Sequence, residues 1–198
     1  MTHDTEPLVD LPNLAAVFEA LRRGRHISMT DGPLYTPLKS HTRGFAGLFA
    51  QLGFELVHHP RDFFYFVDRG NFTDLSARMA VFMCILIEDL ADRGDAIEET
   101  IMSRHFRHGD LPHLTVDRYR RLMREAGITE PEHVEHLLQT MERFGFVDRL
   151  PDESFTFRPP AYRFLDLALD MAAGERTDPN PTNDDSTDND QGPVTDDR

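Results

Sequence analysis

Three absences narrow what this chain can be. It has a single cysteine, Cys84, so no disulfide can form within it, and this usage is typical of a reducing compartment. No apolar run approaches the ~18 residues that a membrane span needs. The N-terminus lacks the basic and apolar segments of a secretory signal. We therefore expect a soluble, cytoplasmic protein that does not enter a membrane, with Cys84 as a small buried hydrophobic residue.

Positive charge is also scarce. The chain of 198 residues has 21 Lys and Arg against 35 Asp and Glu, a formal net charge of −14. Part of this negative charge lies at the C-terminal end, where residues 175–198 include eight acids and two arginines, a net charge of −6. Residues 1–174 therefore carry a net charge of −8. A protein that coats nucleic acid by itself needs a broad excess of Lys and Arg. The charge therefore excludes a protein that coats nucleic acid by itself, whereas localised basic patches remain possible.

Recognisable catalytic motifs are missing as well. The sequence has no Gly-rich phosphate loop, no G-x-S-x-G motif and no Cys-His pairing. Its ten histidines include the neighbours His105, His108 and His113, but no cysteine joins them and no HExxH spacing occurs. We expect no enzyme, no metal and no cofactor; a metal-dependent enzyme built on these three histidines is an alternative hypothesis.

What the sequence does have is a strong hairpin pattern at 52–68. Two runs rich in aromatic and β-branched residues, 54–57 and 63–67, flank a turn that contains Pro60 and Asp62. Gly53 stands where the preceding helix must end, at a position that favours positive φ. The second run is apolar on both faces, whereas a half-buried strand alternates. One face can cover its own domain, and we expect another chain to cover the second.

Helical periodicity surrounds this hairpin, and the arrangement recurs. Phe144-Gly145-Phe146 repeats Leu52-Gly53-Phe54, and a second hairpin follows over 146–158. The predicted helices are 14–22 with Asn13 as cap, 34–52, 74–92 with Thr73 as cap, 96–102, 115–126, one from a capping box at 129–132, and 161–172.

This pattern predicts an α+β, mostly α, fold of two tandem winged-helix domains with short β-hairpin wings. We expect a flexible N-terminal arm over 1–12 and a first winged-helix domain over 13–72. A second domain would cover 73–173, with the nearly all-round apolar helix 74–92 at its centre. The stretch 174–198 is almost free of apolar residues, which predicts a disordered acidic C-terminal tail.

Winged-helix domains often place the helix before the wing in the DNA major groove. In the second unit that helix carries four glutamates against Arg143 alone, and carboxylates repel phosphates. Sequence-independent phosphate contact by the preceding helix is more favourable, and a solvated polar face is the alternative interpretation. The candidate nucleic-acid-binding residues are Arg118, Arg121, Arg124, Arg143, Arg25, Lys39 and Arg43.

Several stretches resemble the MukE/MksE family, the accessory subunits of bacterial condensin-like SMC complexes. The resemblance is carried by Leu21-Arg22-Arg23-Gly24-Arg25-His26-Ile27 and by the runs 54–57 and 63–66. The second half follows in order, with Arg143-Phe144-Gly145-Phe146-Val147, Phe155 and Tyr162-Arg163-Phe164. The similarity covers roughly 14–170 and leaves the acidic end unmatched.

The resemblance implies a non-catalytic, nucleoid-associated subunit in chromosome organisation and segregation or in plasmid defence. Such a subunit would form a homodimer and bind a MukF/MksF-like kleisin, reaching a MukB/MksB-like SMC ATPase through it. It would also contact double-stranded DNA weakly and without sequence specificity. The candidate partner-binding residues are Phe63, Phe64, Tyr65, Phe66, Phe82, Tyr162 and Phe164. A free-standing dimeric winged-helix transcriptional regulator is the alternative.

Overall fold

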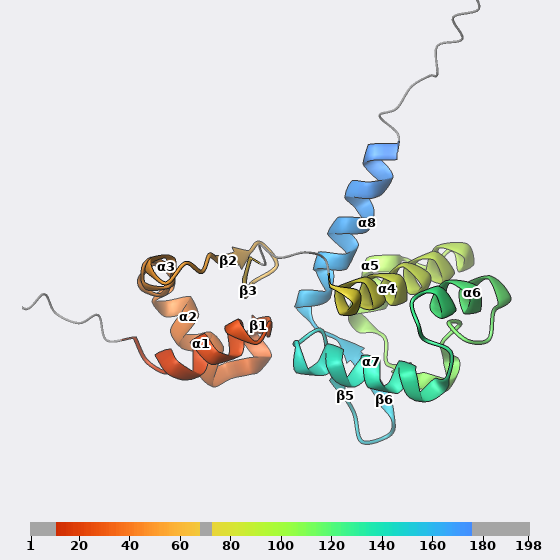
Figure 1. Cartoon of the computed structure of the whole chain (residues 1–198), viewed down its shortest axis with the longest axis horizontal. Coiled ribbons are helices and arrows are strands. Elements are labelled where there is room, and N and C mark those ends of the chain that lie inside the picture. Colours follow the sequence, from red (N-terminus) through yellow and green to blue (C-terminus); the bar gives the residue numbers. More distant parts are fainter. Residues whose placement is uncertain (1–10, 68–72, 176–198) are drawn as a thin grey trace, which may run out of the picture.

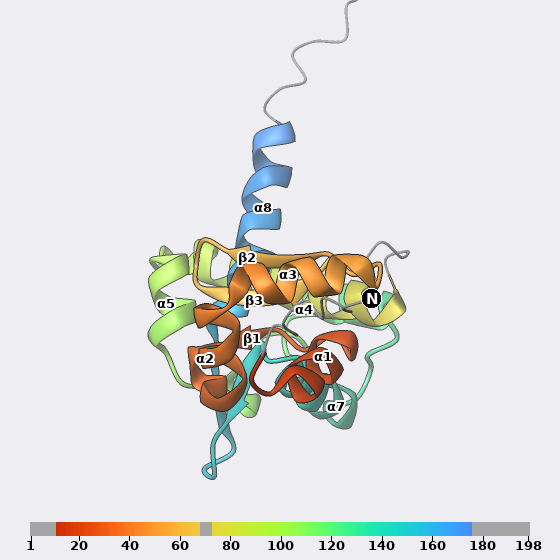
Figure 2. The same ribbon diagram turned by 90° about the vertical axis from the view of Figure 1, so that its left-hand side faces the viewer.

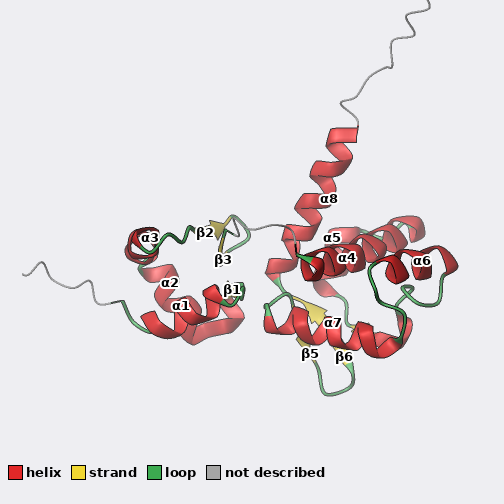
Figure 3. Ribbon diagram, viewed as in Figure 1, coloured by secondary structure: helices red, strands yellow, loops and turns green. Residues whose placement is uncertain are grey.

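The computed structural model describes residues 11–67 and 73–175, with side chains described as far as Ala168 in the last helix. They form two units, which we call unit 1 (11–67) and unit 2 (73–175). Each unit combines helices with one small antiparallel sheet (Figures 1 and 3). None of the helices in these ranges has the length and apolar character needed to span a membrane.

Unit 1 contains three helices and three strands. Their order is α1 (Leu14–Arg22), β1 (Ile27–Ser28), η1 (Met29–Asp31), α2 (Gly32–Ser40), α3 (Thr42–Gln51), β2 (Leu56–His59) and β3 (Phe63–Phe66). The last strand lies between the other two and is antiparallel to both, so that Phe63 stands opposite both His59 and Ser28. The core of this unit is rich in aromatic residues and includes Tyr35, Phe45, Phe49 and Phe64.

Unit 2 repeats this order between two additional helices. It runs α4 (Asp74–Arg93), α5 (Ile97–Ser103), β4 (Phe106–Arg107), η2 (His108–Asp110), α6 (Asp117–Glu125), α7 (Pro131–Arg143), β5 (Val147–Arg149), β6 (Ser154–Phe157), η3 (Pro159–Ala161) and α8 (Tyr162–Glu175). Again the last strand is central, in the order β4-β6-β5. Helix α4 contacts α5, α6, α7 and α8, whereas the outer end of α8 projects away from the body (Figures 1 and 2).

The prediction of a mostly helical α+β fold is confirmed, and so are both hairpins. Gly53 and Gly145 have φ angles of +83° and +82°, as the predicted helix exits require. The cap at Thr73 is also confirmed, because its Oγ1 accepts a hydrogen bond from the amide of Ser76. The strands β1 and β4 are too short to show a pattern in the sequence, and they complete each sheet.

Three details of the helix predictions were wrong. The predicted helix 34–52 is two helices separated at His41, where the Thr42 hydroxyl donates to the Leu38 carbonyl and competes with the backbone. Asn13 precedes α1, but its side-chain amide donates to the Pro33 carbonyl and does not cap the helix. At the start of α7 the flanking residue is Glu130, and the expected capping box does not form.

The environment of Cys84 also differs from the prediction. This residue is exposed on α4, with the exposed Glu88 one turn later. A helix that is apolar nearly all round does not reveal from sequence which side remains uncovered. Helix α8 continues to Glu175, two residues into the predicted tail. The rest of that tail, residues 1–10 of the predicted arm and the segment 68–72 lie outside the described residues.

Candidate functional site: the junction between the units

The stretch from Gly24 to Ser28 connects α1 to β1 and forms the contact between the units. The amide of His26 donates to the Phe144 carbonyl over 2.8 Å. Arg25 donates from Nη1 to the Arg143 carbonyl over 3.0 Å. The exposed backbone carbonyls at the end of α7 are therefore satisfied by unit 1. The two units are joined here by one backbone–backbone and one side chain–backbone hydrogen bond, which a flexible tether would not provide.

Two glycines permit this close approach. A Cβ added at Gly145 would lie 2.5 Å from the His26 carbonyl oxygen. A Cβ at Gly24 would lie 3.1 Å from the Phe144 ring. Both glycines also have positive φ, +82° and +85°. The junction thus requires a glycine, which has no side chain, at one position in each unit.

An ion pair that is nearly excluded from solvent lies beside this contact. The side chain of Arg158, at the end of β6, is 4% exposed and pairs over 2.5 Å with Asp31, whose side chain is 7% exposed. The same Arg158 nitrogen is 2.8 Å from the Ser28 hydroxyl, and Arg25 also pairs with Asp31 over 2.6 Å. Burial would raise the pKa of Asp31, but hydrogen bonds from Arg25 and Ser28, with the charge of Arg158, outweigh it and lower that pKa.

The imidazole of His26 fills the centre of the junction. Its ring centroid lies 5.3 Å from that of Tyr65 and 4.6 Å from that of Phe146. Arg163 donates to His26 Nε2 over 2.6 Å, and its guanidinium lies 4.2 Å from the Tyr65 ring centroid. Burial, followed by the charge of Arg163, lowers the pKa of His26 to about 3. The ring is therefore neutral at physiological pH, with its proton on Nδ1, which has no hydrogen-bond partner within the described ranges.

A second line of contact joins the hairpin of unit 1 to α5 and α8. His59 lies 3.2 Å from the Asp166 carboxylate, and burial lowers the pKa of this histidine despite that contact. Arg61 pairs with Glu98 over 2.7 Å and lies 4.1 Å from the ring centroid of Tyr162. The hairpin of unit 1 thus contacts unit 2 at its turn, through His59 and Arg61, and near the end of β3, through Tyr65. These contacts hold unit 1 in one orientation relative to unit 2.

This arrangement corrects the expectation that another chain covers the second face of the run 63–67. Phe64 points into the core of unit 1, whereas Phe63 and Tyr65 lie on the opposite face with His26 and His59. Since His26 and His59 contact Phe146 and Asp166, this second face is covered by unit 2. The apolar character of both faces has an intramolecular cause.

The candidate partner-binding residues accordingly occupy different environments. Phe63, Phe64 and Phe82 have no exposed surface, so this conformation leaves them no contact with another chain. The other four are half buried: Tyr65 and Tyr162 lie in the junction, Phe66 packs on the core of unit 1, and Phe164 packs on Phe146.

The candidate nucleic-acid-binding residues also divide into two groups. Arg25, Lys39 and Arg118 already pair with carboxylates, namely those of Asp31 for Arg25, Asp62 for Lys39, and Glu88 and Asp92 for Arg118. The others are exposed and have no ion pair within the described part of the chain: Arg43, Arg121, Arg124 and Arg143.

The three neighbouring histidines do not converge. His113 is buried, stacks on Phe82 with ring centroids 4.1 Å apart, and lies 2.9 Å from the Phe82 carbonyl oxygen through its Nε2. Burial lowers its pKa to about 4. His105 and His108 are on the surface. Across the described ranges, no group of three or more His, Cys, Asp or Glu side chains could hold a metal ion.

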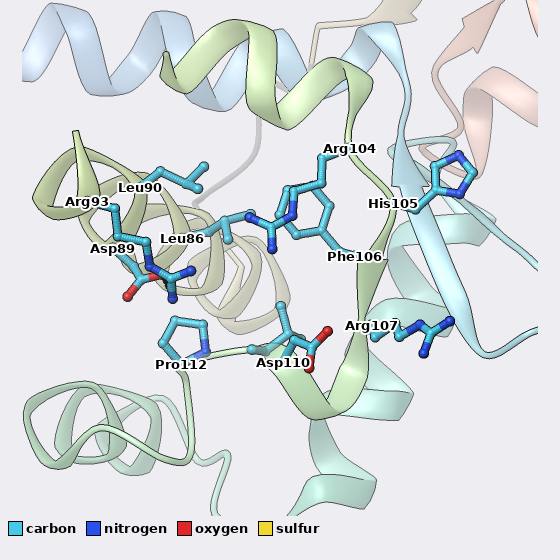
Figure 4. A pocket seen from close by; sticks show the side chains of 11 residues that line it. Leu86, Asp89, Leu90, Arg93, Arg104, His105, Phe106, Arg107, Asp110 and Pro112 are labelled. Carbon is cyan, nitrogen blue, oxygen red and sulfur yellow. Dashed lines mark ion pairs between the residues drawn. The ribbon is translucent and has the colours of Figure 1, made fainter. Parts of the chain in front are cut away.

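A small cavity lies in unit 2 beside the C-terminal end of α4 (Figure 4). Its volume is about 20 Å³, which suits one water molecule. Charged side chains of both signs, including Arg93, Arg104, Asp89 and Asp110, surround it (Figure 4). This cavity is too small for a substrate.

Sequence reasoning missed three junction residues, Asp31, Arg158 and Arg163. They lie far apart in the sequence, and each looks like an ordinary surface charge. The Pro159-Pro160 step after Arg158 was the one local signal that the chain turns sharply there. Nothing in a single sequence pairs a carboxylate with an arginine 127 positions away.

The repeated order of elements and the buried polar junction define a two-unit α+β protein in which the two halves are held in a fixed relative orientation. No curated protein matches the chain. The family model described as condensin complex protein MksE matches residues 12–169, which include both units and the junction between them. The chain therefore belongs to the MksE family, as the resemblance in its sequence predicted.

Proposed function

We propose that this protein is a non-catalytic subunit of a bacterial condensin-like SMC complex, acting in chromosome organisation and segregation or in plasmid defence. The observation that carries the proposal is the family match over 12–169. In this role the protein would form a homodimer and bind a MukF/MksF-like kleisin. It would reach a MukB/MksB-like ATPase through that kleisin and act in the cytoplasm, at the nucleoid.

We propose further that both units are winged-helix domains, with bounds at 13–72 and 73–173. Each contains a helix, a short strand, two helices and a hairpin in that order. In each sheet the last strand lies between the other two. This repeated topology supports a winged-helix assignment, and the hairpins β2-β3 and β5-β6 would be the wings.

Helix α8 is the proposed kleisin contact. Tyr162 and Phe164 lie at its base, and Leu167 in the next turn is 43% exposed. Beyond that turn the helix projects from the body (Figures 1 and 2). Isolated short helices are marginal in water, because most helical stability comes from packing of an apolar face. A kleisin segment packed along α8 would supply that packing and gain ~25 cal/mol for each Å² of apolar surface buried.

Substitution of Leu167 tests this contact. Leu167→Glu places a charge on the proposed interface, whereas Leu122→Glu changes an equally exposed leucine, 42% exposed, on α6. We expect Leu167→Glu to lower the amount of co-expressed kleisin that co-purifies by about tenfold, equivalent to ~1.4 kcal/mol. Leu122→Glu should have no effect. Equal recovery with both variants would contradict the role of α8.

The proposed DNA contact is electrostatic. Arg121 and Arg124 are one turn apart on α6, whereas Arg43 lies on α3 and Arg143 is the last residue of α7. Phosphate contacts by such side chains carry no sequence information and weaken as salt rises. Titration of several duplexes of different sequence at increasing salt tests this proposal. We expect equal affinities that fall as salt rises, whereas affinity that depends on sequence would favour a free-standing regulator.

A further inference from the structure

An open groove lies beside the C-terminal ends of α1 and α7, on the edge of the junction. Its volume is about 590 Å³, within the range of sites that hold a ligand. Unit 1 contributes one wall and unit 2 the other, so the groove exists only while the junction is formed. The lining residues are Glu19, Ala20, Arg23, Arg25, Arg143 and Phe144.

The groove is locally basic in an acidic protein. Glu19 pairs with both Arg23 and Arg22, over 2.6 and 3.0 Å, so this wall retains a positive charge. On the opposite wall, Arg143 has no carboxylate partner in the described part of the chain, and its guanidinium lies 5.2 Å from the Phe144 ring centroid. Arg25 is already occupied by Asp31 and the α7 carbonyls. Among the described residues, Arg143 is thus the groove's cation without a carboxylate partner, and Arg23, which shares the single charge of Glu19 with Arg22, is the second cation.

Between these cations the surface is apolar. The Phe144 ring lies close to Gly24, where an added Cβ would be 3.1 Å from it, and Ala20 lines the same space from α1. The groove therefore combines two guanidinium groups, which bind carboxylates through paired hydrogen bonds, with an apolar floor. A DNA duplex presents a convex, wholly charged surface that would leave this floor empty. A peptide with acidic and apolar side chains fits both features.

We infer that this groove binds an acidic peptide segment of a partner protein, with carboxylates on Arg23 and Arg143 and an apolar side chain on Phe144. This goes beyond the proposed function, because α8 and the groove are separate surfaces and the groove shares with the proposed DNA contact Arg143 alone. Loss of kleisin binding through α8 and loss of peptide binding in the groove can be observed independently.

A short fluorescein-labelled peptide of Asp, Glu, Ser and Phe serves as the probe, with fluorescence anisotropy of the full-length chain as the readout. We expect the double variant Arg23→Gln/Arg143→Gln to weaken probe binding by about tenfold, as expected for the loss of charge-assisted hydrogen bonds. The matched control Arg43→Gln/Arg121→Gln removes the same charge from exposed arginines outside the groove. This control should bind the probe like the unmodified chain.

Three results would overturn the inference. Equal weakening in the two double variants would show attraction to overall charge. Binding of a random duplex that is lost in Arg23→Gln/Arg143→Gln, without peptide binding, would assign the groove to nucleic acid. Stronger competition by a synthetic peptide of residues 176–198 than by the unlabelled probe would assign it to the acidic end of this same chain.

Discussion

The two units share one order of elements but differ in how much core they have. Nine buried apolar residues form the core of unit 1, whereas 22 form the core of unit 2. Small domains bury a smaller fraction of their surface and are correspondingly marginal. We therefore expect unit 1 to depend more on its neighbour than unit 2 does, through the contacts of the buried junction.

The two hairpins show the same contrast. In unit 1 the turn residue Asp62 accepts hydrogen bonds from Lys39, Tyr35 and His58, which lower its pKa. The hairpin fixed in this way packs against unit 2. In unit 2 the tip of the β5-β6 hairpin extends away from the body (Figure 1). One hairpin has become part of an internal contact, while the other remains free for an external one.

The largest expected effect follows from breaking the buried ion pair. Arg158→Met leaves the Asp31 carboxylate with Arg25 and the Ser28 amide in a site that is nearly excluded from solvent, which should lower the free energy of unfolding by about 3 kcal/mol. Urea unfolding followed by circular dichroism measures this change, and unit 1 should unfold first. The control Arg107→Met removes an exposed arginine that lies 3.9 Å from Asp152. Similar stability of both variants would show that unit 1 needs no support from the junction.

An intermediate effect separates backbone strain from contact between the units. Gly53→Ala and Gly145→Ala place a Cβ at nearly the same φ, which costs roughly 1–2 kcal/mol in either unit. At Gly53 the added atom meets open space, whereas at Gly145 it meets the His26 carbonyl oxygen. We expect Gly145→Ala to be less stable than Gly53→Ala by a further ~1–3 kcal/mol in thermal unfolding. Equal losses would mean that the units can separate without cost.

The smallest expected effect is a dependence on acid. Because the pKa of His26 is about 3 in the folded chain and 6.5 in the reference state, its stabilising contribution is complete above 6.5 and is lost as pH falls toward 3. At about pH 6 the loss should be ~1 kcal/mol. The free energy of unfolding is measured at neutral and acidic pH for His26→Gln and for the unmodified chain. The variant should lose less stability on acidification, because it lacks the titrating imidazole.

His113, in the core of unit 2, provides the comparison for that experiment. Its pKa of about 4 places its own acid dependence in the same range of pH. His113→Gln should therefore remove a separate part of the acid sensitivity, and the two effects should add because the residues belong to different clusters. An unchanged acid dependence in His26→Gln would contradict a neutral, buried imidazole at the junction.

The elements of this fold could be predicted from local patterns. Positive φ at Gly53 and Gly145, the cap at Thr73 and the apolar and aromatic runs of the hairpins each depend on residues close in sequence, and all were found as expected. The split at His41 was missed, because the Thr42 hydroxyl competes with a helical pattern that is otherwise continuous. The exposure of Cys84 was missed because it depends on which neighbours pack around α4.

The sequence alone determined most of the helices, both hairpins and the family, since these follow from periodicity, glycine conformation and short motifs. Only the tertiary structure decided what covers the aromatic strand. The pairing of Arg158 with Asp31 and the burial of His26 arise from contacts across more than a hundred residues, and no local pattern encodes such contacts. An apolar face looks the same in sequence whether its own chain or another one covers it. In this protein, unit 2 covers the second face of the aromatic strand.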